Sequence, residues 1–496
     1  MSSPLTTRKL FGVISASSVG TLIEWYDFYL FGSLSAIIST QFFPKDNPTA
    51  ALLSALAVFA AGFIVRPFGA LVFGRLGDVV GRKYTFMVTL VLMGGSTFLI
   101  GLIPGYERLG VVSPLLVLIL RLVQGLALGG EYGGAATYVA EYAPEGRRGY
   151  FTSWIQTTAT LGLFVSLAVI VATRKLVGVQ TFEEWGWRIP FLASILLVGV
   201  SIFIRVKMEE SPLFSKLKAE GKVSRNPLAE SFGKKENLKM VLLALLGATA
   251  GQGVIWYTGQ FYALSFIQKV CNIDFEQSSE LVAVALALGT GGFIFFGWLS
   301  DRIGRKSIML AGMLLGVFTY RPIYQAIYEH TSLQGRIINH STQHENGSGS
   351  SKITTNDLIY TDGTQVREIQ KGSQLKRSIL LNSGDYWTLV MLVLVQVIYV
   401  TMVYGPIAAF LVELFPTHIR YTSMSLPYHI GNGVFGGLTP FLAVALVEKA
   451  SLAGTSQPYL AGLWYPILVA GVCFVIGALY LSPVRKMASD STSFIV

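Results

Sequence analysis

The sequence predicts an all-α membrane protein, with twelve transmembrane helices in two six-helix halves around a central cavity. The chain has 496 residues, of which 52% are hydrophobic and only 13% charged, against roughly 25% charged in an ordinary soluble protein. Apolar stretches approach the roughly 20 residues that a helix needs to cross a bilayer. One short loop sequence occurs twice, as GRLGDVVGRK at 74–83 and GWLSDRIGRK at 297–306.

Apolar runs place six spans in each half. In the first half they cover residues 12–39, 50–75, 84–104, 112–139, 152–172 and 188–206. In the second half they cover residues 239–267, 281–300, 307–326, 386–412, 422–448 and 460–482. The predicted division is therefore an N-terminal half (1–206), a cytoplasmic linker (207–239) and a C-terminal half (240–496).

The placement of charge orients the chain. The formal net charge is +10, but Lys and Arg lie mainly in short loops and in the linker, which is typical of a membrane protein and not of a nucleic-acid-binding surface. The positive-inside rule predicts that both termini are cytoplasmic. The N-terminus has no small-residue cleavage site, so we expect no removable signal peptide. Cys271 and Cys473 alone support neither a disulfide framework nor a metal site, and we expect no cofactor.

A second repeated pair locates an insertion. The loop copies are offset by 223 residues, from Gly74 to Gly297. The second pair is Glu141-Tyr-Ala-Pro with Arg148 and Glu413-Leu-Phe-Pro with Arg420, offset by 272 residues. The difference, 272 minus 223, means that about 49 extra residues lie between 306 and 413. The polar stretch at about 329–385 accounts for them, and we expect it on the outward side, either as a small folded cap or as a mostly disordered segment.

The repeated loops carry matching glycines, acids and bases. Glycine lets helix ends approach closely, and an acid and a base can bridge neighbouring helix ends. One interpretation is that such loops only set the topology. The second copy favours a functional one, a conformational latch that joins the halves on the cytoplasmic side in one state and releases in another. The predicted latch residues are Gly74, Asp78, Arg82, Gly297, Asp301, Arg305, Glu141, Arg148, Glu413 and Arg420.

The repeated loop is similar to the signature between helices two and three of the major facilitator superfamily. Four segments resemble its metabolite:proton symporter branch: GTLIEWYDFYLFG at 20–32, RPFGALVFGRLGD at 66–78, RLVQGLALGGEYGGAATYVAEYAPEGRRGYF at 121–151 and EWGWRIPF at 184–191. That branch includes carriers of 2-oxoglutarate, citrate, shikimate and proline or betaine. The resemblance implies a proton-coupled importer of a small polar metabolite that works by alternating access. It also implies a monomer in a bacterial inner membrane whose partners are substrate, protons and lipid.

Ionisable side chains inside the spans give an independent argument, because such groups are costly in a membrane unless they face a partner or a cavity. Glu24 and Asp27 lie three residues apart on one face of the first span, and Arg121 lies in the fourth. We predict that one acid alternately pairs with Arg121 and takes a proton, which couples transport to a proton gradient. The alternative is a permanent structural ion pair. Glu131 is either a second titrating group or a partner of Arg66.

The predicted substrate-binding residues are Arg66, Arg121, Gln252, Trp256, Tyr257, Gln260, Tyr404 and Asn432. Arg66 precedes a proline, so its guanidinium can either bind a carboxylate or satisfy carbonyls freed by a kink. Gln252, Trp256 and Gln260 are four residues apart in the seventh span. They form either a cavity wall or a set of interface and interhelical contacts.

Enzyme motifs such as HExxH, GxSxG or a phosphate loop do not occur, so we do not expect an enzyme. Drug:proton antiporters of the superfamily resemble one another in a Gly-Pro pattern in the fifth helix, and this fifth span has no proline. Import is therefore favoured over export, and a transporter-like sensor is the remaining alternative. Two intramembrane arginines favour an organic acid, either a mono- or a dicarboxylate. A zwitterion of the proline or betaine type would instead use the aromatic side chains of the seventh span.

Overall fold

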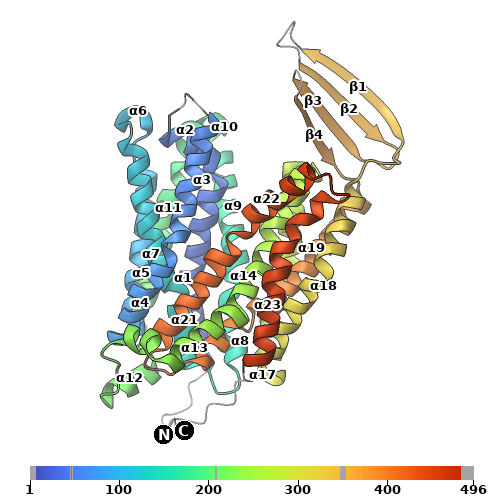
Figure 1. Cartoon of the computed structure of the whole chain (residues 1–496). Helices are drawn as coiled ribbons and strands as arrows, with labels where there is room; N and C mark the ends of the chain where they lie inside the picture. The colour runs from blue at the N-terminus through green and yellow to red at the C-terminus, as the bar shows by residue number, and fades with distance from the viewer. Residues whose placement is uncertain are drawn as a thin grey trace.

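The computed structural model describes residues 7–44, 46, 48–206, 209–346, 353–371 and 374–481. It is a bundle of long helices in two halves, with a small β-sheet standing at one end (Figure 1). The predicted cytoplasmic ends of the chain, residues 1–6 and 482–496, lie outside the described residues.

The first half is entirely helical. Its helices are α1 (Thr7–Ser33), α2 (Ser35–Phe42), α3 (Pro48–Ile64), α4 (Arg66–Val79), α5 (Arg82–Leu102), α6 (Tyr106–Leu109), α7 (Val112–Tyr142), α8 (Arg148–Gln156), α9 (Thr158–Val177), α10 (Val179–Thr181), the π-helix η1 (Phe182–Gly186) and α11 (Arg188–Val206). The predicted second span is broken between α3 and α4, because Pro67 at the start of α4 cannot continue a helix. The break places Arg66 at a helix start inside the bundle.

The linker contains α12 (Pro212–Ala219) and the π-helix η2 (Ala229–Gly233). The second half contains α13 (Lys235–Ala244), η3 (Leu245–Thr249), α14 (Ala250–Tyr257), η4 (Thr258–Tyr262), α15 (Ala263–Lys269), α16 (Phe275–Gly289), α17 (Gly291–Ile303), α18 (Arg305–Thr331), α19 (Ser383–Tyr404), α20 (Ile407–Leu414), α21 (Arg420–His429), η6 (Ile430–Gly436), α22 (Thr439–Leu452), η7 (Pro458–Leu463) and α23 (Trp464–Tyr480).

Eleven helical stretches among the described residues are long and apolar enough to cross a membrane. They are Ala57–Val79, Arg82–Leu102, Val112–Tyr142, Arg148–Val177, Arg188–Val206, Lys235–Lys269, Phe275–Ile303, Arg305–Thr331, Ser383–Leu414, Arg420–Leu452 and Pro458–Tyr480. They coincide with eleven of the twelve predicted spans. The remaining predicted span, the first, corresponds to α1 and α2, which pack inside the first half against α3, α7 and α9. The predicted all-helical membrane bundle is therefore confirmed.

The polar insertion forms a four-stranded antiparallel sheet between α18 and α19. Its strands are β1 (Ile338–Asn346), β2 (Ile353–Tyr360), β3 (Gln365–Lys371) and β4 (Gln374–Leu380), paired in chain order. Of the two predicted alternatives, the described residues of this stretch form a folded cap. Opposite charges face each other across the strands, with Asp357 opposite Arg367 and Glu368 opposite Arg377, which supports this register.

The sheet is fixed to the second half at its base. The backbone N–H of Asp274 donates to the carbonyl of Ile379 at 2.8 Å, and the N–H of Ile379 donates to the carbonyl of Asn272 at 2.8 Å. Arg336 pairs with Asp385 at 2.9 Å and with Asp362 in the β2–β3 turn. The sheet lies at the end of the bundle opposite α12 (Figure 1). We call these the sheet end and the linker end.

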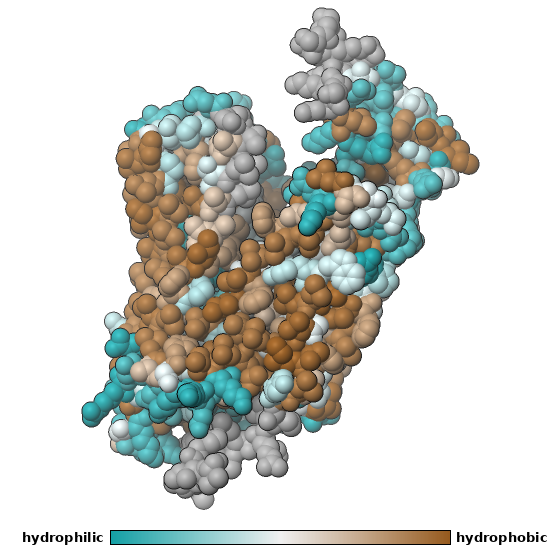
Figure 2. Space-filling view, viewed as in Figure 1, coloured by the Kyte–Doolittle hydropathy of each residue, from teal (hydrophilic) through white to brown (hydrophobic). Residues whose placement is uncertain are grey.

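The two halves are in contact at the linker end and separate toward the sheet end. At the linker end α4 packs against α21, and α17 packs against α8, so each half places a helix against the other. Figure 2 shows a hollow between the halves at the sheet end, and on the visible face a broad hydrophobic band between two hydrophilic ends. A band of this kind is the surface that a bilayer covers.

Candidate functional site

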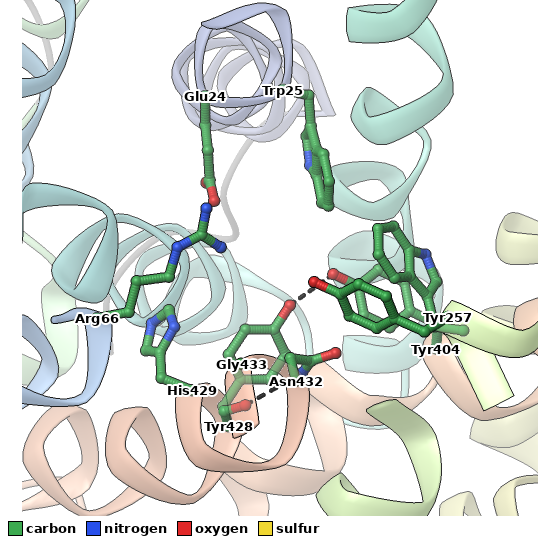
Figure 3. Close-up of a pocket in the computed structure, with 10 residues that line it drawn as sticks. Glu24, Trp25, Arg66, Tyr257, Tyr404, Tyr428, His429, Asn432 and Gly433 are labelled. Atoms are coloured by element: carbon green, nitrogen blue, oxygen red, sulfur yellow. Dashed lines mark hydrogen bonds between the residues drawn. The ribbon is translucent and has the colours of Figure 1, made fainter. Parts of the chain in front are cut away.

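A pocket lies between the two halves, inside the bundle. The first half contributes Glu24, Trp25 and Arg66, and the second contributes Trp256, Tyr257, Tyr404, Tyr428, His429, Asn432 and Gly433 (Figure 3). Five of the predicted substrate-binding residues therefore line it: Arg66, Trp256, Tyr257, Tyr404 and Asn432. Arg121, Gln252 and Gln260 do not. The break between α3 and α4 and the π-helix η6 bring Arg66 and Asn432 to the same space.

The charged groups of the pocket face each other. The Arg66 guanidinium, at the start of α4, points toward the Glu24 carboxylate of α1 (Figure 3). It also lies 4.3 Å from the centre of the Phe63 ring, a favourable cation–π distance. The Nε of Arg66 is buried and has no hydrogen-bond partner among the described residues. Arg66 thus retains unused donor capacity beside the pocket, which an anionic ligand can satisfy.

Aromatic rings form most of the remaining wall. Tyr132 of α7 stacks on Tyr428 of α21, with ring centres 3.7 Å apart and planes 4° apart. The Tyr428 hydroxyl lies 2.5 Å from the Tyr404 hydroxyl, and Gln156 donates to the Tyr132 hydroxyl at 2.7 Å. This network of hydroxyl groups connects the two halves at the pocket. Because Tyr404 and Tyr428 also line the pocket, a change in their positions alters contacts in both halves.

A second set of rings narrows the pocket toward the sheet end. Trp25 and Trp256 approach with ring centres 5.3 Å apart across the two halves. Phe28 and Phe261, one helical turn further from the linker end, approach to 6.0 Å. Aromatic contacts between the two halves thus continue from the pocket lining at Trp25 and Trp256 to Phe28 and Phe261.

Asp27 and Arg121 are joined only indirectly. The Thr97 hydroxyl donates to the Asp27 carboxylate at 2.6 Å. Gln124 in turn donates to the Thr97 hydroxyl at 2.7 Å and accepts a hydrogen bond from Arg121. The other carboxylate oxygen of Asp27 is buried without a partner. Within the described part of the chain, no ion pair joins Arg121 to Asp27 or Glu24, so the predicted acid–arginine pair is absent from this state.

Arg121 instead packs under aromatic rings, 4.4 Å from the centre of Phe31 and 5.1 Å from that of Phe59. It is 3% exposed and does not line the pocket. Its assignment to the substrate-binding residues stays a prediction.

Glu131 pairs with Arg205, and the suggested pairing with Arg66 is wrong. The Arg205 guanidinium lies 2.7 Å from the Glu131 carboxylate, and the Thr89 hydroxyl donates to the same acid at 2.9 Å. Arg205 also donates to the carbonyl of Phe86. Both charged side chains are at most 1% exposed. Sequence reasoning missed Arg205, although an arginine inside the predicted sixth span was the signal that could have found it.

The predicted stripe of amide, indole and amide on the seventh span is only partly present. Gln252 and Asn432 form a reciprocal amide pair, with donor–acceptor distances of 3.1 and 2.9 Å. Gln252 thus supports the pocket wall from behind. Trp256 lines the pocket, but η4 begins at Thr258. Gln260 lies within this π-helix and is not among the residues that line the pocket.

The latch residues join the halves at the linker end by two equivalent contacts. Asp78 accepts hydrogen bonds from the backbone N–H groups of Tyr421 and Thr422, at 3.3 and 2.8 Å. Asp301 accepts from those of Gly149 and Tyr150, at 2.9 and 2.8 Å. In each case a carboxylate of one half caps the first turn of a helix in the other half, where N–H groups are free and the helix dipole favours an anion.

The latch bases complete each contact. Arg82 lies 3.1 Å from Asp78 and 3.6 Å from Glu141, and donates to the carbonyl of Thr417 at 2.7 Å. Glu141 also pairs with Arg420 across the halves at 3.1 Å. In the second copy Arg305 lies 2.6 Å from Asp301 and 3.0 Å from Glu413.

Arg148 departs from this pattern. Its Nε donates to the carbonyl of Ala140 at 3.2 Å, and it forms no ion pair within the residues that the structure describes. The two latch contacts are therefore alike in their acids but not in every base.

Two glycine pairs make the close contact possible. A Cβ on Gly74 would lie 2.9 Å from the Cα of Thr422, and one on Gly297 would lie 2.4 Å from the Cβ of Ser153. Gly81 and Gly304, equivalent in the two loops, have φ of 141° and 97°, a region that only glycine adopts readily. The repeated glycines thus let helices of opposite halves touch.

The linker also takes part in the first latch contact, which sequence reasoning missed. Glu210 accepts from the backbone N–H groups of Arg82 and Lys83 at 3.2 Å, at the start of α5. Ser211 donates to the Glu141 carboxylate, and the Phe214 ring lies 4.6 Å from the Arg82 guanidinium. The latch thus includes linker residues as well as the repeated loops.

Comparison with known proteins gives consistent matches. Residues 13–241 match the family described as sugar (and other) transporter. The chain is 30% identical to the proline/betaine transporter of Escherichia coli strain K12, over 95% of this chain and 83% of that protein. It is also 30% identical to the alpha-ketoglutarate permease of the same strain, over 96% of this chain and 94% of that protein. A structure of the proton:xylose symporter XylE matches with a TM-score of 0.71 and 15% identity, covering 97% of this chain and 98% of its own.

Proposed function

This chain belongs to the major facilitator superfamily, and from that membership we propose that it imports a small carboxylate-bearing metabolite in symport with protons. It is a multi-pass membrane transporter and not an enzyme. The observation that carries the proposal is the placement of Glu24 and Arg66 in one aromatic-walled pocket between the halves (Figure 3).

The facing charges provide a coupling mechanism. When Glu24 is ionised, it neutralises Arg66 and competes with a substrate carboxylate for the guanidinium. When Glu24 takes a proton, Arg66 is released to bind the carboxylate through its planar fork. Proton and anion therefore bind together. The pocket switches its access from one side of the membrane to the other only when both are bound or both are absent. In this mechanism Glu24 is the coupling acid, and Asp27 has a supporting role through its hydrogen bond with Thr97.

The substrate follows from the pocket lining. One arginine faces the pocket, which suits one carboxylate better than two. The proline or betaine class gains support from the five aromatic side chains around the same space, because a cationic nitrogen is attracted to ring faces. These side chains are Trp25, Trp256, Tyr257, Tyr404 and Tyr428. An organic acid with a single carboxylate, which uses Arg66 alone, is the second candidate.

The membrane orientation is also part of the proposal. The linker and latch face the cytoplasm, and the sheet faces outward. The contact of the halves at the linker end, with the hollow at the sheet end, then corresponds to a state closed to the cytoplasm. Alternating access requires that the latch contacts break and the aromatic rings at Trp25, Phe28, Trp256 and Phe261 close more tightly.

Proteoliposomes with an imposed pH gradient test this function. We expect uptake of radiolabelled glycine betaine or proline to exceed that of lactate, and both to exceed that of 2-oxoglutarate. Arg66→Gln should abolish uptake of all carboxylates, while Arg66→Lys, which keeps the charge but loses the fork, should retain a small part of it. Uptake that is indifferent to the pH gradient, or that survives in Arg66→Gln, contradicts the proposal.

A further inference from the structure

A hydrophobic groove with basic residues at one end lies on the outside of the bundle, between α13 and α23. The residues that line it are Lys235, Leu238, Lys239, Leu242, Leu243, Leu246, Ile476 and Tyr480. It is separate from the transport pocket and shares no residue with it. In Figure 2 the surface over α13 and α23 is hydrophobic and is bordered by hydrophilic residues at the linker end.

The groove exists because α23 packs closely against η3 and α14 and diverges from α13. Gly247 and Gly477 meet backbone to backbone, since a Cβ on Gly477 would lie only 2.6 Å from the carbonyl oxygen of Gly247. All residues of α13 that line the groove precede Gly247, so the groove lies on the linker side of this crossing. Small residues at a crossing allow such close approach of membrane helices, and the larger side chains beyond it leave a wedge-shaped space.

The walls of the wedge have the chemistry of lipid contact. Leu238 and Leu242 of α13 and Leu246 of η3 follow at intervals of four and are 36%, 47% and 37% exposed. Tyr480 on α23 is 63% exposed. Lys235 and Lys239 are adjacent to this stripe, one turn apart, where α13 leaves the linker. None of the described residues that line the groove is acidic, so no neighbouring carboxylate in the lining neutralises the two ammonium groups.

We propose that this groove binds one anionic phospholipid. Its phosphate lies between Lys235 and Lys239 at the headgroup level, and one acyl chain follows Leu238 and Leu242 toward the crossing at Gly247. Charge complementarity selects this occupant over a neutral lipid, because each lysine near an anionic lipid headgroup contributes to binding and basic pockets between membrane helices on the cytoplasmic side bind such headgroups. The inference does not depend on the transported substrate.

Native mass spectrometry of the purified, delipidated protein tests the proposal. The protein is titrated with phosphatidylglycerol or with phosphatidylcholine of the same acyl chains. We expect one tight phosphatidylglycerol per chain. The double variant Lys235→Gln/Lys239→Gln should bind it on the order of 30-fold more weakly, as expected for two such charges. Leu242→Trp, which fills the wedge and leaves both lysines, should lose the same single lipid.

The matched control is Lys216→Gln/Lys222→Gln, which removes two exposed linker charges outside the groove and should bind phosphatidylglycerol like the unmodified protein. Three results overturn the proposal. Equal binding of phosphatidylcholine shows that the lysines do not select the headgroup. Unchanged binding in Leu242→Trp places the lipid elsewhere. A dimer mass that disappears in Leu242→Trp shows that a second copy of the chain occupies the groove.

Discussion

The carboxylate of Asp78 in the first half accepts a hydrogen bond from the backbone N–H of Thr422 in the second half, at 2.8 Å. The same relation occurs with the halves exchanged, because Asp301 accepts from the N–H of Tyr150 at 2.8 Å. Asp78 and Asp301 differ by 223 positions, and Tyr150 and Thr422 by 272, which are the two offsets of the sequence repeat. The internal repeat is therefore also a repeat of contacts between the halves, and these contacts stabilise one conformational state.

Replacing one latch acid should slow transport without uncoupling it from protons. A hydrogen bond to a charged group contributes roughly 1.5–3 kcal/mol, so Asp78→Asn should lower the population of the closed linker end about tenfold or more. We expect a reduced initial uptake rate and an unchanged final accumulation ratio at a fixed pH gradient, with Asp301→Asn behaving alike. Arg75→Gln, an exposed change in the same helix, is the control. A lowered accumulation ratio with a normal rate would assign proton coupling to the latch.

The two acids of α1 should behave differently. Glu24 faces Arg66 in the pocket, whereas Asp27 is held by Thr97. We expect Glu24→Gln to bind substrate with an affinity that no longer depends on pH, and to exchange substrate without accumulating it. Asp27→Asn should keep the pH dependence of affinity, with a lower rate. Substrate binding measured by thermal shift at two pH values, together with counterflow in proteoliposomes, separates the two. The opposite pattern would assign coupling to Asp27 and Arg121, the pair that the sequence suggests.

Glu131 should be required for stability and not for proton coupling. Its carboxylate is fully buried against Arg205 at 2.7 Å. Removing one partner of such a pair leaves an uncompensated charge, at a cost of roughly 3–5 kcal/mol. Glu131→Gln should therefore lower the thermal midpoint of unfolding strongly. Glu131→Leu combined with Arg205→Met removes both charges and should recover much of the loss, with active uptake retained. A stable Glu131→Gln protein that fails to accumulate substrate would instead make Glu131 a titrating group.

Features that depend on one segment alone were predictable from the sequence. Hydropathy located the spans, and the repeated loops identified Asp78, Asp301 and their bases, because both signals are local. The latch geometry was only partly accessible. The sequence showed which acids and bases are repeated, but not that each carboxylate binds backbone N–H groups. Almost every residue has a backbone N–H, so the residue types do not indicate which of these groups binds a carboxylate.

Features that depend on the register between helices were not predictable in this way. Arg121 was expected in the pocket because it is charged inside a span, yet in this structure it lies beside Phe31 and Phe59, outside the pocket lining. Glu131 forms an ion pair with Arg205, which lies 74 residues later in the chain. Gln260 lies in the π-helix η4 and is not among the residues that line the pocket. Tyr428 was missed, although Asn432 four residues later was predicted, because a tyrosine in an apolar span gives no signal of its own.

The β-sheet should be dispensable for transport. No residue of β1 to β4 lines the pocket, and the described contacts of the sheet with the bundle involve only its base. The outer strands β1 and β4 are separated by three strand spacings of about 4.8 Å, or roughly 14 Å, which six extended residues can span. Replacing 338–378 with a six-residue Gly-Ser linker keeps Ile379 and its bonds to Asn272 and Asp274. We expect substrate affinity and accumulation within about twofold of the full chain.

Arg336→Gln in the full-length chain is the matched control, because it removes the ion pairs to Asp385 and Asp362 while the sheet remains. Uptake kinetics and the thermal midpoint of unfolding are measured for both variants. If the deletion leaves uptake intact but Arg336→Gln lowers it, a loosened sheet obstructs the hollow at the sheet end. If the deletion itself raises the KM in a protein that is stably folded, the sheet takes part in capturing substrate, and its position at the mouth of the hollow is then functional.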